Sequence, residues 1–352
     1  MPENEGKRKN ASASSNRSDI IELKGEGILC EATDNNVRMY RVRLTEFPDG
    51  PALWQTEEQL NRPDFVQKYK ETRIPSTADL SKFHILLGDV KGEFIDVRNE
   101  VDDVGCPENF TYINSSIYSE DVPRPCTPIL LCECIDDCIS NCPCVHEKCY
   151  DSNGRVSAPI NAPLMECSSK CQCGKNCKTK VVQKGTTVGF EIRRFNLKGW
   201  GVVTKRDIPR GTFIAEYVGE IISFEEAERR GIEDTAVGLT YLFDMDMACG
   251  YTESADFSVD AKTHGNVTHF FNHSCSPSME IRPVYIEHRD PRLHRLAFFS
   301  TRNIRAGEEL TFDYSPSYNF NESTIADLQR LDGSVKFACY CRDKRCRNYI
   351  YF

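Results

Sequence analysis

Residues 132–144 read C-E-C-I-D-D-C-I-S-N-C-P-C, and residues 167–177 read C-S-S-K-C-Q-C-G-K-N-C. Zinc takes four thiolate or imidazole ligands in a tetrahedron. Nine cysteines therefore fill three zinc sites if three of the sulfurs each bridge two metals, and the Cys-x-Cys spacing suits such sharing. Nine buried free thiols are a much poorer explanation outside an oxidising compartment. The expected ligands of a three-zinc cluster are Cys132, Cys134, Cys138, Cys142, Cys144, Cys167, Cys171, Cys173 and Cys177.

The sequence just after the first segment offers two further candidate zinc ligands. His146 and Cys149 lie close by, and either could replace one of the nine cysteines. Every ligand position is a protein side chain, which leaves no position for a substrate water. The zinc cluster is therefore expected to be structural.

A second cysteine group lies near the end of the chain. Cys339, Cys341 and Cys346 supply three ligands, and Cys275 is the natural fourth, which gives four zinc ions in all. Such a site would pin the C-terminal residues against the chain near residue 275. The other cysteines are expected to be small buried hydrophobic residues: Cys30, Cys106, Cys126, Cys149 and Cys249.

Charge and hydrophobicity exclude several classes of protein. The 352 residues hold 44 Lys and Arg against 53 Asp and Glu, a net charge of -9. An acidic balance argues against binding to a phosphate backbone and suits a basic partner, although general solubility explains the same number. Residues 1–19 lack the apolar core of a secretory signal, and no run is long enough to span a membrane. A non-secreted chain with 18 cysteines favours metal over disulfides.

Composition and periodicity divide the chain into segments. Strands are expected through residues 186–222, and a helix from Ser223 that Gly231 ends. The predicted segments are a disordered tail (1–18), a strand–turn–helix module (19–74), a connector (75–125), the cysteine-rich block (126–185), a β-rich region (186–318), an insertion (319–334) and the second cysteine group (335–352).

Five short motifs follow the cysteine block in a fixed order. They are G-W-G at 199–201, E-Y-V-G-E at 216–220, Y-L-F-D at 241–244, N-H-S-C at 272–275 and E-L-T-F-D-Y at 309–314. With the cysteine groups on either side, residues 126–352 resemble the pre-SET, SET and post-SET regions of the suppressor-of-variegation family of histone H3 lysine-9 methyltransferases. The resemblance implies a mainly β fold with short helices. It also implies small sheets, a knot-like C-terminal threading, a three-zinc pre-SET module and a zinc-binding post-SET.

The resemblance also implies roles for the motif residues. Tyr314 would be the catalytic tyrosine of an aromatic channel that Tyr217 also lines, and Phe312 would control how many methyl groups fit. Asp244 and Phe243 would contact the peptide. Residues expected to bind S-adenosylmethionine are Gly199, Trp200, Gly201, Tyr241, His269, Asn272 and His273.

The motif residues have simpler explanations when each is taken alone. Trp200, Tyr217 and Phe243 could be ordinary core aromatics, because aromatic residues mostly lie buried. His269 also departs from the family, since most SET domains have Arg there; members with His exist, so an altered rate is expected rather than lost activity. The ordered set of motifs carries the assignment.

The N-terminal module resembles a degenerate chromodomain. Readers of methyl-lysine hold the ligand in a cage of three aromatic residues. Here only Phe47 matches a cage position, Leu44 stands where Trp is expected, and Trp54 matches a structural position. The module is therefore expected to read methyl-lysine poorly.

The expected function is di- or trimethylation of lysine 9 in the histone H3 tail, giving heterochromatin-type marks in the nucleus. Expected partners are the H3 tail and chromatin-associated proteins, with no membrane and no sequence-specific nucleic acid. Two alternatives stay open: a catalytically weak chromatin-binding scaffold, and a methyltransferase for another histone or non-histone lysine.

Overall fold

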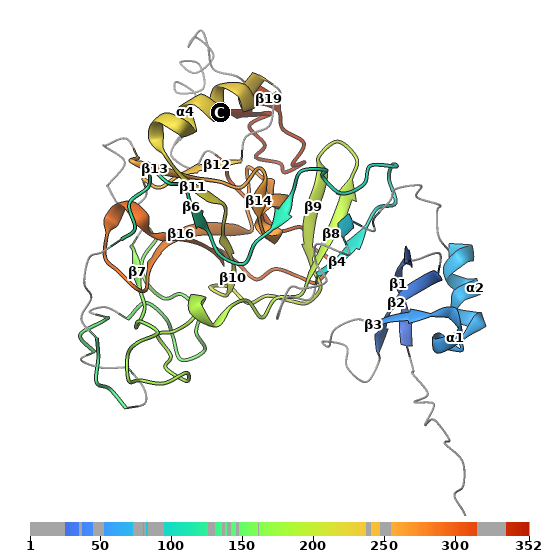
Figure 1. Ribbon diagram of the computed structural model, residues 1–352, viewed down its shortest axis with the longest axis horizontal. Helices are drawn as coiled ribbons and strands as arrows, with labels where there is room; N and C mark the ends of the chain where they lie inside the picture. Colours follow the sequence, from blue (N-terminus) through green and yellow to red (C-terminus); the bar gives the residue numbers. More distant parts are fainter. Residues whose placement is uncertain are drawn as a thin grey trace, which may run out of the picture.

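The chain folds into several small β-sheets joined by few helices, as Figure 1 shows. This agrees with the predicted mainly β class. The computed structural model describes residues 25–34, 37–44, 53–72, 80, 82–83, 95–125, 131–135, 138, 142–145, 148–160, 162–236, 241–246, 255–314 and 336–351.

An N-terminal unit combines a three-stranded antiparallel sheet with two helices. Its elements are β1 (Gly25–Asp34), β2 (Val37–Leu44), β3 (Leu53–Thr56), α1 (Glu57–Leu60) and α2 (Pro63–Thr72). Tyr40, Val42, Leu60 and Val66 form its core. The predicted turn at residues 47–50 lies outside the described residues.

Three larger sheets build the second part of the chain. The first consists of β4 (Ile95–Arg98), β8 (Phe190–Phe195) and β9 (Gly199–Thr204). The second consists of β10 (Phe213–Tyr217), β17 (Arg295–Ser300), β16 (Met279–Tyr285) and β7 (Leu164–Met165). The third consists of β12 (Leu242–Asp244), β13 (Phe257–Asp260), β11 (Glu220–Ser223) and β6 (Ile117–Tyr118).

Short strand pairs and 3₁₀ turns complete this part. The pairs are β14 (His264–Gly265) with β5 (Thr111–Tyr112), β15 (Asn272–His273) with β18 (Thr311–Phe312), and β19 (Lys336–Ala338) with β20 (Tyr349–Tyr351). The 3₁₀ turns are η1 (Val182–Lys184), η2 (Val267–Phe270) and η3 (Pro291–Leu293). The β15–β18 pair joins the fourth and fifth motifs side by side.

The range 75–125, predicted as a connector, contributes three strands to these sheets. Ile95 pairs with Phe190, Thr111 with His264, and Ile117 with Glu220, each time in parallel. Parallel partners need not be neighbours in sequence, so local periodicity gives no sign of these pairings.

Helix α4 (Phe224–Ala236) is longer than predicted. The expected stop at Gly231 is wrong, because the helix continues for another turn and more beyond it. A glycine inside a helix costs only about 1 kcal/mol relative to alanine. Here Gly231 lies against Leu242, where an added Cβ would meet the leucine Cδ1 at 3.4 Å.

A buried carboxylate joins the cysteine-rich segment to the second sheet. Glu166 is fully buried between β7 and Cys167. It accepts hydrogen bonds from the Tyr150 hydroxyl (2.9 Å) and from the backbone N–H groups of Val181 (3.1 Å) and Val182 (2.7 Å). The Gln183 side-chain amide donates to it as well (2.9 Å). These donors offset the cost of burying its charge.

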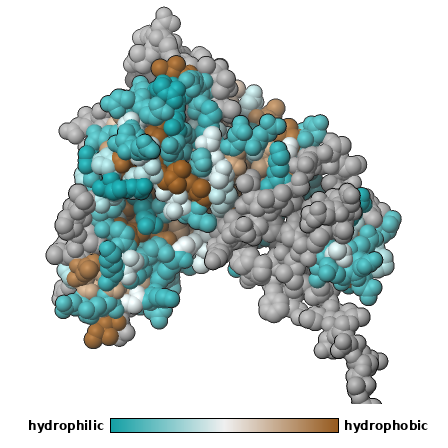
Figure 2. Space-filling view, viewed as in Figure 1, coloured by the Kyte–Doolittle hydropathy of each residue, from teal (hydrophilic) through white to brown (hydrophobic). Residues whose placement is uncertain are grey.

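The drawn face of the molecule is largely hydrophilic, with small hydrophobic patches between polar regions (Figure 2). Exposed large hydrophobic residues of the described chain include Ile135, Ile160 and Ile232. Within the described residues, no helix is long and apolar enough to cross a membrane.

Candidate active site and metal clusters

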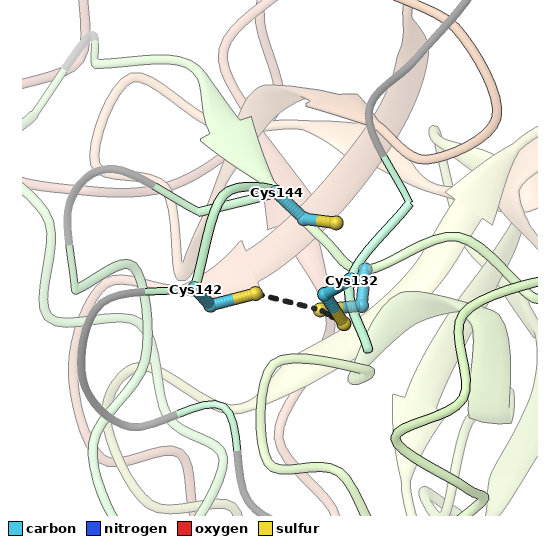
Figure 3. Close-up of side chains that lie close together, drawn as sticks. Cys132, Cys142 and Cys144 are labelled. Carbon is cyan, nitrogen blue, oxygen red and sulfur yellow. Dashed lines mark hydrogen bonds between the residues drawn. The ribbon is translucent and has the colours of Figure 1, made fainter. Parts of the chain in front are cut away.

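The nine cysteines of the first block gather in one cluster. Eight of them are buried and Cys134 is half-buried. Figure 3 shows the Cys142 side chain directed toward Cys132, with Cys144 beside them. Ligand atoms lie within 4.8 Å of one another in three groups: Cys132, Cys142, Cys144 and Cys167; Cys132, Cys134, Cys138 and Cys142; and Cys132, Cys138, Cys167 and Cys173.

The spacing of these sulfurs fits tetrahedral zinc. A Zn–S bond of about 2.3 Å places two sulfurs of a tetrahedron about 3.8 Å apart. The Sγ atoms of Cys132 and Cys138 lie 3.7 Å apart, those of Cys132 and Cys167 3.9 Å, and those of Cys142 and Cys167 3.6 Å. Cys132 belongs to all three groups, whereas the prediction has each shared sulfur bridging two metals.

Cys171 and Cys177 belong to the same cluster. Cys171 Sγ lies 3.5 Å from Cys144 Sγ, and Cys177 Sγ lies 3.1 Å from the Thr179 hydroxyl. Burial raises the pKa of Cys173 to about 11, whereas the hydrogen bond with Cys167 lowers the pKa of Cys177 to about 4. The thiols thus share protons, and a cation is the natural replacement for those protons.

His146 and Cys149 are the two alternative zinc ligands at the edge of the first cysteine block. Cys149 lies in a separate apolar cluster with Tyr150 and Leu164, and its sulfur accepts a hydrogen bond from the Met165 N–H (3.3 Å). His146 lies outside the described residues. Of the other unassigned cysteines, Cys106 is buried, as expected.

The second cysteine group is assembled from two distant segments. The ligand atoms of Cys275, Cys339, Cys341 and Cys346 lie within 4.8 Å of one another, and Cys275 Sγ is 3.8 Å from Cys339 Sγ. This brings the end of the chain next to the N-H-S-C motif.

His273 connects this group to Tyr314. Its Nδ1 accepts a hydrogen bond from the Tyr314 N–H (3.1 Å), and its Nε2 lies 3.3 Å from Cys275 Sγ and 3.4 Å from the Arg347 guanidinium. Burial lowers the pKa of His273 to about 4, so the ring is neutral. Both of its ring nitrogens are therefore engaged within the protein.

The hydroxyl groups of two tyrosines each donate a hydrogen bond to a backbone carbonyl. The Tyr314 hydroxyl donates to the Phe271 carbonyl (2.7 Å), and the Tyr217 hydroxyl donates to the Tyr241 carbonyl (2.6 Å). Burial raises the pKa of both phenols above the usual value, so both keep their protons. A phenol that donates its hydrogen can also accept a hydrogen bond through its oxygen.

A continuous row of aromatic rings links these tyrosines. Phe312 lies 4.7 Å from Tyr314 and 4.9 Å from Phe298 between ring centroids. Tyr217 lies 6.3 Å from Phe298 and 5.7 Å from Phe243. The structure thus brings Tyr314, Phe312, Tyr217 and Phe243 into the same region.

Tyr241 and His269 form a stacked pair. Their rings lie 4.2 Å apart with an interplanar angle of 8°, and Phe110 lies 4.4 Å from the imidazole. His269 Nδ1 donates to the Ala261 carbonyl (2.7 Å), and burial lowers the pKa of this histidine to about 4.

The G-W-G motif opens β9 directly after the turn from β8. Gly199 has a φ of +78°, a conformation that glycine adopts without strain. The Trp200 indole N–H donates to the Gly105 carbonyl (3.1 Å), and its ring packs edge-on against Phe83 at 4.9 Å. Asn272 Nδ2 donates to the Trp200 carbonyl (3.1 Å), which places the first and fourth motifs in contact.

Asp244 ends β12, which is an edge strand of the third sheet in the described chain. Its side chain is exposed, and its Oδ1 accepts a hydrogen bond from the Ser258 hydroxyl (2.6 Å). An edge strand with a free carboxylate oxygen can accept an added peptide strand that carries a cation.

Comparisons with known proteins agree with this geometry. The family model described as the SET domain matches residues 199–315, and that described as the Pre-SET motif matches residues 89–180. Human histone-lysine N-methyltransferase SUV39H2 is 42% identical over 321 residues, which cover 87% of this chain and 75% of the relative.

The chain belongs to the SUV39 family of histone-lysine N-methyltransferases. It spans about two thirds of the length of the first curated SUV39 relatives that it matches, from 62% to 75%.

Solved SET structures have the same fold as this SUV39-family chain. The Neurospora SET domain protein DIM-5, a histone lysine methyltransferase, is 33% identical with a TM-score of 0.58, over 65% of this chain and 97% of its own. KRYPTONITE in complex with mCHH DNA, an H3(1-15) peptide and SAH is 26% identical with a TM-score of 0.62, over 94% of this chain and 62% of its own.

Sequence reasoning missed two charged residues of this SUV39-family site. Lys198 and Glu309 form an ion pair, and Glu309 Oε1 accepts a hydrogen bond from Asn272 Nδ2 (3.0 Å). They line a cleft of about 450 Å³ with Tyr340, Cys341 and Arg342. Lys198 directly precedes one predicted motif and Glu309 begins another, which was the only sign of them in the sequence.

Proposed function

We propose that this chain transfers methyl groups from S-adenosylmethionine to the side-chain amine of lysine 9 in the histone H3 tail. The observation that supports this proposal most directly is the pair of phenols at Tyr314 and Tyr217. Both donate their protons to backbone carbonyls and lie beside a row of aromatic rings. Membership of the SUV39 family supports the same activity.

The chemistry of methyl transfer fits these residues. S-adenosylmethionine, when bound, supplies a methyl group on a sulfonium, and the acceptor must be a neutral amine. An apolar aromatic lining lowers the pKa of a lysine amine by desolvation and excludes water. The Tyr314 oxygen would accept a hydrogen bond from that amine and hold its lone pair in line with the methyl group. Tyr217 would contact the lysine amine from the side opposite Tyr314.

Phe312 would set the number of methyl groups. It is 8% exposed and contacts Tyr314 without presenting a hydroxyl group. A site without that hydroxyl has room for an amine that already carries one or two methyl groups. The proposed products are therefore di- and trimethyl-lysine.

The peptide would lie along the edge strand that ends at Asp244, with Phe243 beneath it. The free carboxylate oxygen of Asp244 suits a guanidinium next to the target lysine. The chain's net charge of -9 suits a basic tail. In the KRYPTONITE complex an H3(1-15) peptide is the bound partner, which supports an H3 tail as the substrate here.

Four zinc ions would hold the two cysteine groups, three in the first and one in the second. The sulfur spacing of both groups supports this assignment. All expected ligands are cysteines of the chain, so the role of these ions is structural. The contact between Asn272 and Trp200 supports a cofactor site where the first and fourth motifs meet. The proposed cofactor-binding residues are Gly199, Trp200, Gly201, Tyr241, His269, Asn272 and His273.

The proposed place of action is chromatin in the nucleus, where H3 tails and chromatin-associated proteins are the partners. The N-terminal unit is proposed to be a chromodomain-like module. No role in sequence-specific nucleic-acid binding is proposed.

The test is methyl transfer from labelled S-adenosylmethionine by the zinc-loaded protein. The acceptors are H3 peptides with lysine 9 intact or replaced by alanine, and Tyr314→Phe is the variant. Transfer should require both lysine 9 and Tyr314, and mass spectrometry should count more than one methyl group. Transfer to the alanine peptide would place the target elsewhere, and no transfer at all would favour a binding scaffold.

A further inference from the structure

The space above Gly201 is filled by the Phe195 ring and by two polar side chains from distant parts of the chain. A Cβ at Gly201 would lie 2.5 Å from Asn272 Nδ2 and 2.9 Å from Glu309 Oε1. Both distances are shorter than any ordinary contact, so only glycine admits the pair. The glycine therefore makes room for protein side chains, whatever else it does for a ligand.

The hydrogen bonds of Asn272 fix which way its amide faces. Its Nδ2 donates to the Trp200 carbonyl (3.1 Å) and to Glu309 Oε1 (3.0 Å). An amide nitrogen has two hydrogens, and a carbonyl or carboxylate oxygen can only accept, so both hydrogens are used. The amide oxygen is left as an acceptor, and no described residue donates a hydrogen bond to it.

Glu309 is itself held in place by Lys198. The two side chains pair while only 17% and 20% exposed, respectively, at the wall of the cleft of about 450 Å³. One carboxylate oxygen serves Lys198 and the other serves Asn272. A half-buried pair of this kind resists rotation more than an exposed one, because each partner would lose its charge partner in a poorly solvated site.

We propose that Glu309, anchored by Lys198, is a positioning residue that turns the Asn272 amide oxygen toward the cofactor. There the oxygen accepts a hydrogen bond from the ammonium group of the cofactor's amino-acid moiety. The inference rests on the proposed function, since it needs S-adenosylmethionine bound next to Asn272. Gly201, Lys198 and Glu309 would then act together to orient the side-chain amide of Asn272.

Glu309→Gln tests the device, with binding of S-adenosylhomocysteine to the full zinc-loaded chain measured by calorimetry. Lys198 should attract the glutamine oxygen, which turns the glutamine NH₂ toward Asn272. The Asn272 amide then meets an NH₂ group on one side and the Trp200 carbonyl on the other, so neither of its orientations satisfies both and its oxygen is no longer held toward the ammonium. Loss of a hydrogen bond to a charged group should weaken binding by about tenfold to a hundredfold. In turnover, the KM for S-adenosylmethionine should rise more than kcat falls.

Glu308→Gln is the matched control. This neighbouring glutamate pairs with Arg302 instead and accepts from the Arg305 N–H. Its binding of S-adenosylhomocysteine should equal that of the wild type. Thermal melting of both variants checks that they are folded.

A double variant separates orientation from simple structural damage. Lys198→Met alone should weaken binding, but by less than Glu309→Gln does, because Glu309 loses its anchor and still accepts from Asn272. Adding Lys198→Met to Glu309→Gln should restore most of the binding, since the glutamine oxygen is then free to accept from Asn272. Wild-type binding by Glu309→Gln, or no recovery in the double variant, would overturn the inference alone. A wild-type chain that binds no S-adenosylhomocysteine would overturn the proposed function with it.

Discussion

The imidazole of His269 lies flat against the phenol ring of Tyr241, 4.2 Å away and within 8° of parallel. The hydrogen bond from its Nδ1 to the Ala261 carbonyl fixes the tautomer, and Phe110 and Phe270 close two further sides. The ring is thus held neutral in an aromatic setting. In most SET domains, by the resemblance noted above, an arginine would bring a charge to this place.

The buried His269 should make the fold sensitive to acid. Its pKa is about 4 in the folded chain against 6.5 for an ordinary histidine, so the unfolded chain binds the proton more readily. The free energy of unfolding should be highest above about pH 6.5. As the pH drops toward 4, protonation of this group in the unfolded chain should lower it by about 3 kcal/mol. Urea denaturation of wild type and His269→Gln across this window is the measurement. Parallel pH profiles for the two proteins would contradict it.

Phe312→Tyr should lower the number of methyl groups transferred. The added hydroxyl would occupy space beside Tyr314, whose ring centre is 4.7 Å from that of Phe312. The second transfer should slow at least about tenfold, which is roughly 1.4 kcal/mol in the barrier. Mass spectrometry of the peptide product counts the methyl groups. Phe257→Tyr, on β13 near Arg292, is the control that should leave the count unchanged.

Gly201→Ala should destabilise the fold by about 1–3 kcal/mol, because its Cβ would overlap Asn272 and the Phe195 ring. Gly189→Ala is the matched control, since a Cβ there meets only Lys205 at an ordinary 3.5 Å. Thermal melting compares the two. Equal melting temperatures would show that the neighbours of Gly201 can move aside at no cost.

Zinc content should respond differently to the loss of two cysteines. Cys275→Ser should remove one of four zinc ions and leave the first cluster intact. Cys132→Ser should remove more than one, because its sulfur belongs to three groups. Elemental analysis per mole of protein decides this. A loss of exactly one ion in both variants would argue against shared sulfurs.

Glu166→Gln should destabilise the fold by about 3 kcal/mol. The glutamine oxygen can keep the three donors that bond to Oε1, but its NH₂ would then face the Gln183 N–H groups that bond to Oε2, and the charge that all these donors stabilise would be gone. Chemical denaturation measures the change. Glu100→Gln, in an exposed pair with Arg98, should stay within about 0.5 kcal/mol of wild type. Similar values for both variants would show that the buried carboxylate contributes little.

The sequence predicted most reliably what its local patterns encode. Cysteine spacing pointed to both clusters, and the strand–turn–helix pattern of residues 19–74 pointed to the strands and helix α2 of the N-terminal unit. It did not reveal β5 or β6, because two-residue strands have no periodicity, and their partners lie far along the chain. Gly231 misled, because one glycine inside a helix costs only about 1 kcal/mol relative to alanine and does not end the helix by itself.

The proposed role of Glu309 shows a second limit of prediction from sequence. A glutamate that begins a β-rich motif looks like a solvated residue when it is taken alone. Only the fold places it against Lys198 and Asn272, on segments that the linear order keeps apart. Site residues that act through another side chain are therefore the hardest to find from sequence.

The parallel strands β4, β5 and β6 also bear on how the chain assembles during synthesis. Each leaves the ribosome well before its partner, and β5 waits for His264. Closing such long loops is slow, so these early strands spend time with unpaired edges exposed. The cysteine-rich block is made in that interval. Early capture of metal by this block would shorten the loops still to be closed and hasten the final pairing.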